Sequence, residues 1–117
     1  MTDVSDLIGK PYIPHGRGKD GYDCYGLTVE VLKRMGLSLR DIESSEADIS
    51  ELGMYGSTLN VRKTERTEEG VILAMQYENE LHLGVCLDEK SFIHATRNGV
   101  RISRIGVFPV INKYEVI

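Results

Sequence analysis

The sequence lacks the features that mark membrane, secreted and nucleic-acid-binding proteins. No apolar run approaches the roughly 20 residues of a membrane-spanning helix, so we expect no membrane span. Residues 1–7 have no basic start followed by an apolar core, so they predict that a secretory signal is absent. We therefore expect the protein to be made in the cytoplasm. The formal net charge is −4, so bulk binding to nucleic acid is not expected.

Cysteine is scarce as well. The two cysteines, Cys24 and Cys86, are too few for a disulfide framework, and we expect both to be reduced. A length of 117 residues with 41% hydrophobic content predicts one globular domain over residues 1–117. Residues 41–51 carry five acids and no base, whereas residues 90–104 carry four bases and no acid. The basic segment is either a solvated face or a rim beside a site that meets anionic groups.

The clearest predicted element is an amphipathic helix that begins at Cys24. Asp23 is a favourable N-cap and Gly36 a favourable residue just past the C-terminus. Cys24 would lie in the first turn, where unpaired N–H groups and the helix dipole stabilise a thiolate. Alternatively, Cys24 is a small core residue, the commoner role of a free cysteine on an apolar face. That face consists of Cys24, Leu27, Thr28, Val31, Leu32 and Met35.

The remaining segments predict an α+β fold, with helices first and an antiparallel sheet after them. A short helix is expected over residues 3–8, and glycines and prolines predict that the loop over residues 9–21 walls a site. A second short helix is expected over residues 46–52, and an exposed loop over residues 60–70. Strands that complete a meander are predicted at residues 71–75, 81–87, 91–96, 100–103 and 107–111.

Two histidines lie on consecutive predicted strands. If residues 88–90 form a three-residue hairpin loop, Gly84 pairs with His94, and His82 becomes a same-face diagonal neighbour of His94. A register error of one residue would separate the two rings. Gly84 would also leave room for a helix end to approach closely. With Cys24, the histidines form a Cys–His–His arrangement of nucleophile, base and orienting group.

Other interpretations of these three residues stay open at this point. A single histidine on a strand is more often a half-buried structural residue than a catalytic one. Cysteine and histidine are also zinc ligands. The sequence has no closely spaced Cys or His pair, however, so we expect no metal site and no cofactor. Cys86 is most simply a core thiol.

The motifs resemble those of a known family. Pro11-Tyr12 with the glycine-rich loop after it, and then residues 21–27, resemble the catalytic motif of the NlpC family of papain-like cell-wall peptidases. His82-Leu83-Gly84-Val85 and Phe92-Ile93-His94-Ala95 are similar to the two histidine motifs of that family. The resemblance covers residues 7–103.

The resemblance implies the papain-like NlpC fold and hydrolysis of amide bonds in peptidoglycan stem peptides, typically between D-glutamate and a diamino acid. It implies Cys24 as the nucleophile, His82 as the base and His94 as the third member of the triad. It also implies that Tyr12 and Asp23 line the substrate cleft.

Three further residues are candidates for contact with the substrate. Stem peptides carry carboxylates, so either Arg17 or Arg97 is expected to pair with one. The family usually has Ser after the cysteine, whereas Tyr25 stands here, a form similar to members found in phage tails. We therefore expect a stem peptide or muropeptide as partner, with phage-tail proteins as further partners, and action in a virion tail or at the cell wall. The alternatives are a non-catalytic tail assembly protein with this fold, and an amidase or transferase that acts on another amide.

Overall fold

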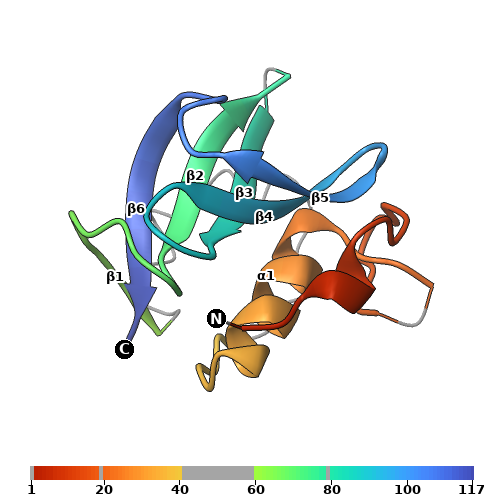
Figure 1. Cartoon of the computed structure of the whole chain (residues 1–117), viewed down its shortest axis with the longest axis horizontal. Coiled ribbons are helices and arrows are strands. Elements are labelled where there is room, and N and C mark those ends of the chain that lie inside the picture. The colour runs from red at the N-terminus through yellow and green to blue at the C-terminus, as the bar shows by residue number, and fades with distance from the viewer. Residues whose placement is uncertain (1, 19, 41–59, 79) are drawn as a thin grey trace.

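The computed structural model describes residues 2–18, 20–40, 60–78 and 80–117. In this part of the chain, one α-helix packs against a six-stranded antiparallel sheet, which confirms the predicted α+β class (Figure 1). The helix predicted over residues 46–52 lies outside the described residues. The elements in chain order are η1 (Ser5–Leu7), α1 (Cys24–Arg34), β1 (Val61–Lys63), β2 (Ile72–Tyr77), β3 (Glu80–Cys86), β4 (Ser91–Thr96), β5 (Gly99–Arg104) and β6 (Val110–Val116).

The strands do not follow one another across the whole sheet. Their order is β1-β6-β2-β3-β4-β5, so β2 to β5 form a meander and β6 then returns to pair with β2 (Figure 1). The prediction of a meander through the last strand was therefore wrong. The outer edge of β5 is already occupied, because Gly9 N–H donates to the Val100 carbonyl and Val100 N–H donates to the Lys10 carbonyl. The last strand pairs at the other end of the meander instead.

Two boundaries at the far side of the sheet also differ from the prediction. Residues 60–70 were predicted as a loop, but they contain the short strand β1, which pairs with β6. The strand predicted over residues 107–111 begins only at Val110. Gly106 turns the chain with a φ of 105°, and Pro109 has no N–H to donate to a ladder.

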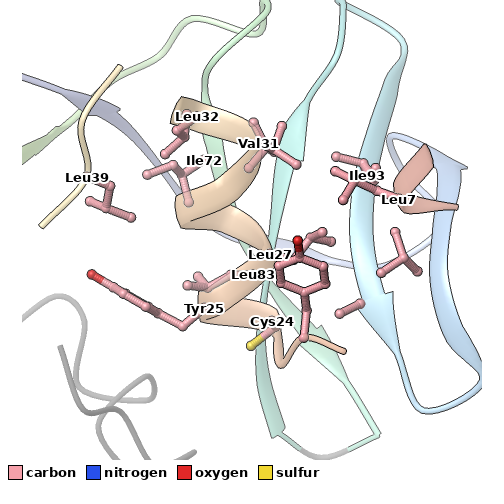
Figure 2. Close-up of a cluster of buried hydrophobic side chains, with 14 of the residues drawn as sticks. Leu7, Cys24, Tyr25, Leu27, Val31, Leu32, Leu39, Ile72, Leu83 and Ile93 are labelled. Atoms are coloured by element: carbon pink, nitrogen blue, oxygen red, sulfur yellow. The ribbon is translucent and has the colours of Figure 1, made fainter. Parts of the chain in front are cut away.

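Helix α1 forms as its sequence predicts. The carboxylate of Asp23 caps it, since Asp23 Oδ1 accepts a 2.6 Å hydrogen bond from Gly26 N–H. Beyond the C-terminus, Gly36 has a φ of 81° and Leu37 N–H donates to the Leu32 carbonyl, as in a Schellman turn. The predicted apolar face is the buried one, and Figure 2 shows it against the sheet.

Apolar side chains cover both faces of the central strands. Leu83, Val85 and Ile93 pack with the helix in one cluster (Figure 2). A second cluster on the opposite face consists of Val71, Leu73, Met75, Cys86 and Phe92, with Ile105 and Phe108 packed against it. Burial on both faces explains why β2 is a continuous apolar run rather than an alternating one.

The β3–β4 hairpin has the predicted register. Gly84 pairs with His94, and Asp88 Oδ1 accepts hydrogen bonds from the backbone N–H groups of Lys90 and Ser91 at 2.7 and 2.8 Å. An Asx turn of this kind holds the loop at one length. The side chain of Asp88 therefore fixes which residues face each other along the hairpin.

The role predicted for Gly84 was wrong. A Cβ at this position would lie 2.7 Å from Cδ2 of Phe92 and 3.1 Å from Cε of Met75. Gly84 faces the second apolar cluster, on the side of the sheet away from α1. Its missing side chain makes room for Phe92 rather than for the end of a helix.

Gly26 offers a test of how closely the N-terminal loop packs on the helix. A Cβ at Gly26 would collide with the Gly16 carbonyl oxygen. We expect Gly26→Ala to lower the free energy of unfolding by about 1–3 kcal/mol, because the loop must move off the helix start. Chemical denaturation measures this change. Lys33→Ala, on the exposed face of the same helix, is the control and should change stability by less than about 0.5 kcal/mol. Equal losses in the two variants would contradict the packing.

Candidate active site

Two buried histidines and a serine form a hydrogen-bonded chain across three strands. Nε2 of His82 and Nδ1 of His94 lie 3.0 Å apart, as the register of β3 and β4 requires. Nε2 of His94 lies 2.8 Å from Oγ of Ser103 on β5. Only 6% of the surface of His82 and 1% of that of His94 is exposed.

Aromatic rings enclose the two imidazoles. The ring of Tyr77 lies 4.9 Å from that of His82, measured between centroids. The rings of Phe92 and Phe108 lie 4.6 and 5.7 Å from that of His94. These rings keep water from the imidazoles, which disfavours the charged form of each.

Burial lowers the pKa of both histidines. It brings the pKa of His82 to about 3, with a smaller contribution from His94. It brings the pKa of His94 to about 4, with a smaller contribution from the positive charge of Arg101. Both rings are therefore neutral at pH 7, and each carries one proton. Because Nε2 of His82 faces His94, Nδ1 is the nitrogen of His82 that can accept a proton from elsewhere.

Cys24 lies at the first residue of α1, as predicted. It is 5% exposed, and Figure 2 shows its sulfur at the N-terminal end of the helix. It belongs to the helix-side cluster together with Leu83, whereas His82, one residue before Leu83 in β3, shares the opposite face of the sheet with Gly84 and the second cluster. His82 forms its hydrogen bond with His94. Both cysteines are free, as expected from their number.

The N-terminal loop brings three of the predicted residues together at the helix start. Nη1 of Arg17 donates to Oδ1 of Asp23 over 2.9 Å, and the guanidinium lies 5.7 Å from the centre of the Tyr25 ring. Asp23 is 5% exposed and Tyr25 is 1% exposed. The hydroxyl of Tyr25 donates to the Arg40 carbonyl over 2.5 Å. These contacts hold the loop on the helix; the substrate contacts predicted for the three residues stay predictions.

The other two predicted contact residues lie in different segments of the chain. Tyr12 forms an isolated bridge with Tyr22, in the segment that leads into the helix. Arg97 lies in the exposed turn between β4 and β5, within 3.4 Å of carboxylate oxygens of Glu78 and Glu80. The substrate roles of Tyr12 and Arg97 also stay predictions.

A cavity of about 410 Å³ lies at a different place, between β6, β2 and the segment after β1. Lys63, Leu73 and Lys113 are among its lining residues, and none of the predicted site residues is. Among the described residues, no group of three or more His, Cys, Asp or Glu side chains is placed to hold a metal ion. Within the same residues, no helix has the length and apolar character to cross a membrane.

The sequence analysis missed Ser103 and Phe108. Ser103 pairs directly with Phe92 and therefore shares a sheet face with His94. The two-residue turn before Gly99 could have revealed this register, because a tight hairpin determines every pair behind it. Phe108 follows β5 in an irregular segment, and no local pattern indicates that it contacts a histidine.

Comparison with known proteins identifies the family. The family model described as NlpC/P60 family matches residues 9–113. The chain belongs to the NlpC/P60 family. It is 28% identical over 105 residues to the probable peptidoglycan endopeptidase LytE of Bacillus subtilis (strain 168), covering 90% of this chain and 29% of LytE. It is 27% identical over 99 residues to the probable endopeptidase p60 of Listeria grayi, covering 84% of this chain and 18% of p60. The chain thus spans less than a third of the length of these relatives.

Solved structures of the NlpC/P60 family have the same fold. The NlpC/p60 domain of the peptidoglycan hydrolase SagA matches with a TM-score of 0.62 and 22% identity, over 92% of this chain and 88% of that one. NlpC1 from Trichomonas vaginalis matches with a TM-score of 0.68 and 20% identity, over 97% of this chain and 41% of that one. At these identities the likeness shows the fold alone.

The two cysteines should differ in reactivity. Cys86 is fully buried in the second cluster, and burial raises the pKa of its thiol to about 11. Cys24 lies at a helix N-terminus, where a thiolate is stabilised. We expect iodoacetamide to label the native protein at Cys24, the Cys86→Ala variant at the same rate, and the Cys24→Ala variant far more slowly. Mass spectrometry measures the labelling. Equal rates at the two thiols would contradict this assignment.

The buried histidines should make the protein sensitive to acid. An unfolded histidine titrates near ~6.5, whereas the pKa is about 3 for His82 and about 4 for His94 in the folded protein. Below pH ~6.5 the unfolded chain therefore binds more protons than the folded one, and the free energy of unfolding should fall as the pH falls towards 4. Urea denaturation at several pH values measures this slope.

A double variant isolates the contribution of the two histidines to the pH dependence of stability. His82→Asn combined with His94→Gln removes both titrating rings, so its stability should depend less on pH over the same range. His15→Asn controls for the loss of an exposed imidazole elsewhere. If the double variant keeps the slope of the wild type, the acid sensitivity has another origin.

Proposed function

We propose that this member of the NlpC/P60 family is a cysteine peptidase that hydrolyses amide bonds in peptidoglycan stem peptides. The observation that supports this most directly is the 3.0 Å hydrogen bond between His82 and His94, buried in the same sheet that packs against the helix of Cys24 with its other face. LytE, a relative by sequence, is described as a probable peptidoglycan endopeptidase. SagA, a relative by fold, is described as a peptidoglycan hydrolase.

The proposed reaction has two halves. Nδ1 of His82 takes the proton of the Cys24 thiol, and the thiolate attacks the carbonyl carbon of the scissile amide. The imidazolium then gives this proton to the departing amine as the C–N bond breaks, which leaves a thioester on Cys24. Next, His82 takes a proton from water, and the hydroxide attacks the thioester. The C–S bond then breaks, the imidazolium of His82 returns its proton to the sulfur, and the carboxylic acid product leaves.

Each residue of the triad meets an electrostatic need of this reaction. The exposed N–H groups at the start of α1 favour negative charge on the sulfur of Cys24. A thiolate beside His82 favours the imidazolium, and so opposes the effect of burial on the pKa of that ring. His94 accepts from Nε2–H of His82 and holds the ring in place. Contacts between nucleophile and base are often long without substrate and shorten in the complex.

Two further parts of the proposal are which bond is cut and where the protein acts. The bond between D-glutamate and a diamino acid is the proposed target, and carboxylates of the stem peptide are the groups that Arg97 would bind. Arg17 already pairs with Asp23, so its charge is partly offset. Action in a phage tail, or at the cell wall, stays a prediction. The names of the relatives described above do not mention phage tails.

Digestion of purified sacculi tests the proposal. The wild type should release fragments with new amino groups, and mass analysis of the fragments should place the cut within the stem peptide. Cys24→Ala should release none, because the nucleophile is gone. Cys86→Ala is the matched control and should keep the activity of the wild type, since this thiol is fully buried in the second cluster and is not a reactant of the proposed mechanism.

Variants of the two histidines test their separate roles. His82→Asn should be as inactive as Cys24→Ala, because proton transfer is lost. His94→Gln should keep measurable activity, because a side-chain amide still offers an acceptor to His82. If both histidine variants match the wild type in kcat/KM on a soluble muropeptide, the triad is wrong. A folded wild type that cuts neither sacculi nor muropeptides would instead favour a non-catalytic role or another amide as substrate.

A further inference from the structure

Both ring nitrogens of His94 have a polar partner. Nδ1 lies 3.0 Å from Nε2 of His82, and Nε2 lies 2.8 Å from Oγ of Ser103. At 1% exposure, the ring of His94 has little access to water. The bond to Ser103 is therefore the contact that satisfies its second nitrogen.

We propose that Ser103 is a positioning residue of the active site: its hydroxyl holds the orientation of His94 and supplies the acceptor that the Nε2–H tautomer of His94 needs, and through His94 it supports the tautomer of His82 that can act as a base. This inference rests on the proposed function. It adds a fourth residue to the triad, one that touches neither the substrate nor the sulfur.

The positions of the ring protons are linked along this chain of hydrogen bonds. For Nδ1 of His82 to accept the thiol proton, the proton of the neutral ring must be on Nε2, from which it is donated to Nδ1 of His94. His94 must then carry its own proton on Nε2, and this N–H is donated to Oγ of Ser103. Ser103 is half-buried, so its hydroxyl proton can turn towards solvent. The hydroxyl oxygen is thus the final acceptor in the sequence of bonds that leaves His82 ready to act as a base.

Removal of the hydroxyl takes the acceptor away from Nε2–H of His94 and so favours the other tautomer of this ring. In Ser103→Ala, Nε2–H of His94 would be a buried donor without an acceptor, which is unfavourable. The other tautomer of His94 avoids this, because its proton is on Nδ1 and is donated to Nε2 of His82. His82 then carries its proton on Nδ1, where it cannot accept one from a thiol.

The backbone holds Ser103 at this place. Ser103 is the direct cross-strand partner of Phe92, and His94 is the partner of Arg101, so Ser103 and His94 are same-face diagonal neighbours. The strand register of β4 and β5 therefore brings the hydroxyl to the ring.

Steady-state kinetics on a soluble muropeptide provide the first test. Ser103→Ala should lower kcat roughly tenfold, the effect of losing one hydrogen bond, and should leave KM close to that of the wild type. Ser103→Thr keeps a hydroxyl and should keep most of the activity. Ser5→Ala is the matched control, because it removes a hydroxyl that bonds to Asp3 and not to a histidine or to the β3–β4 turn. In a His94→Gln background, Ser103→Ala should have little further effect, because Ser103 acts through His94.

Nitrogen-15 NMR of the histidine rings provides a test that needs no activity. In the wild type, the proton of His94 should be on Nε2, and in Ser103→Ala the form with the proton on Nδ1 should increase. A purely structural serine would not change this pattern. If the wild type cuts no peptidoglycan, the proposed function fails, while the ring tautomers still decide the role of Ser103.

Two results would overturn the inference. One is a folded Ser103→Ala protein with the kcat and the ring tautomers of the wild type. The other is a Ser103→Thr protein as slow as Ser103→Ala, which would show that the shape of the side chain matters and the hydroxyl does not. If Ser103→Ala does not fold, Ser103→Cys takes its place, because a thiol is a weaker acceptor and the same results are expected in the same direction.

Discussion

The register of the β3–β4 hairpin is the constraint on which the site depends. The contact between His82 and His94 exists because Gly84 lies opposite His94, and a shift of one residue would turn one of the two rings to the other face of the sheet. The carboxylate of Asp88 holds the turn that sets this register, through two backbone N–H groups. A residue outside the site thus determines whether its two histidines can meet.

The helix start is the second fixed point of the structure. The carboxylate of Asp23 accepts hydrogen bonds both from Gly26 N–H and from Arg17, so one side chain caps the helix and ties down the loop before it. The absence of a side chain at Gly26 lets the loop approach closely. The thiol of Cys24 is therefore held on a helix, and His82 and His94 are held on a sheet. Helix α1 packs on β3 and β4, the two strands that carry the histidines.

The apolar surroundings of the two histidines keep both rings neutral, and they should lower the free energy of unfolding in acid. Two imidazoles enclosed by aromatic rings are kept neutral, and neutral rings can hold defined tautomers. No buried polar side-chain atom of the described residues lacks a hydrogen-bond partner, so this polar chain is satisfied within the apolar core. The aromatic enclosure comes from three separate elements, β2, β4 and the segment before β6.

The sequence by itself determined the local structure and the contact between the two histidines. Helix α1 with its cap, the alternation of β3 and the register that joins His82 to His94 were all predicted, because each depends on neighbouring residues or on one short turn. Only the tertiary structure decided that β6 returns to β2 and that Ser103 reaches His94. It also decided that Phe92 fills the space beside Gly84, where a helix end had been predicted. These features depend on pairings between segments distant in the chain, and on which sheet edge is already covered, and no local pattern of residues carries that information.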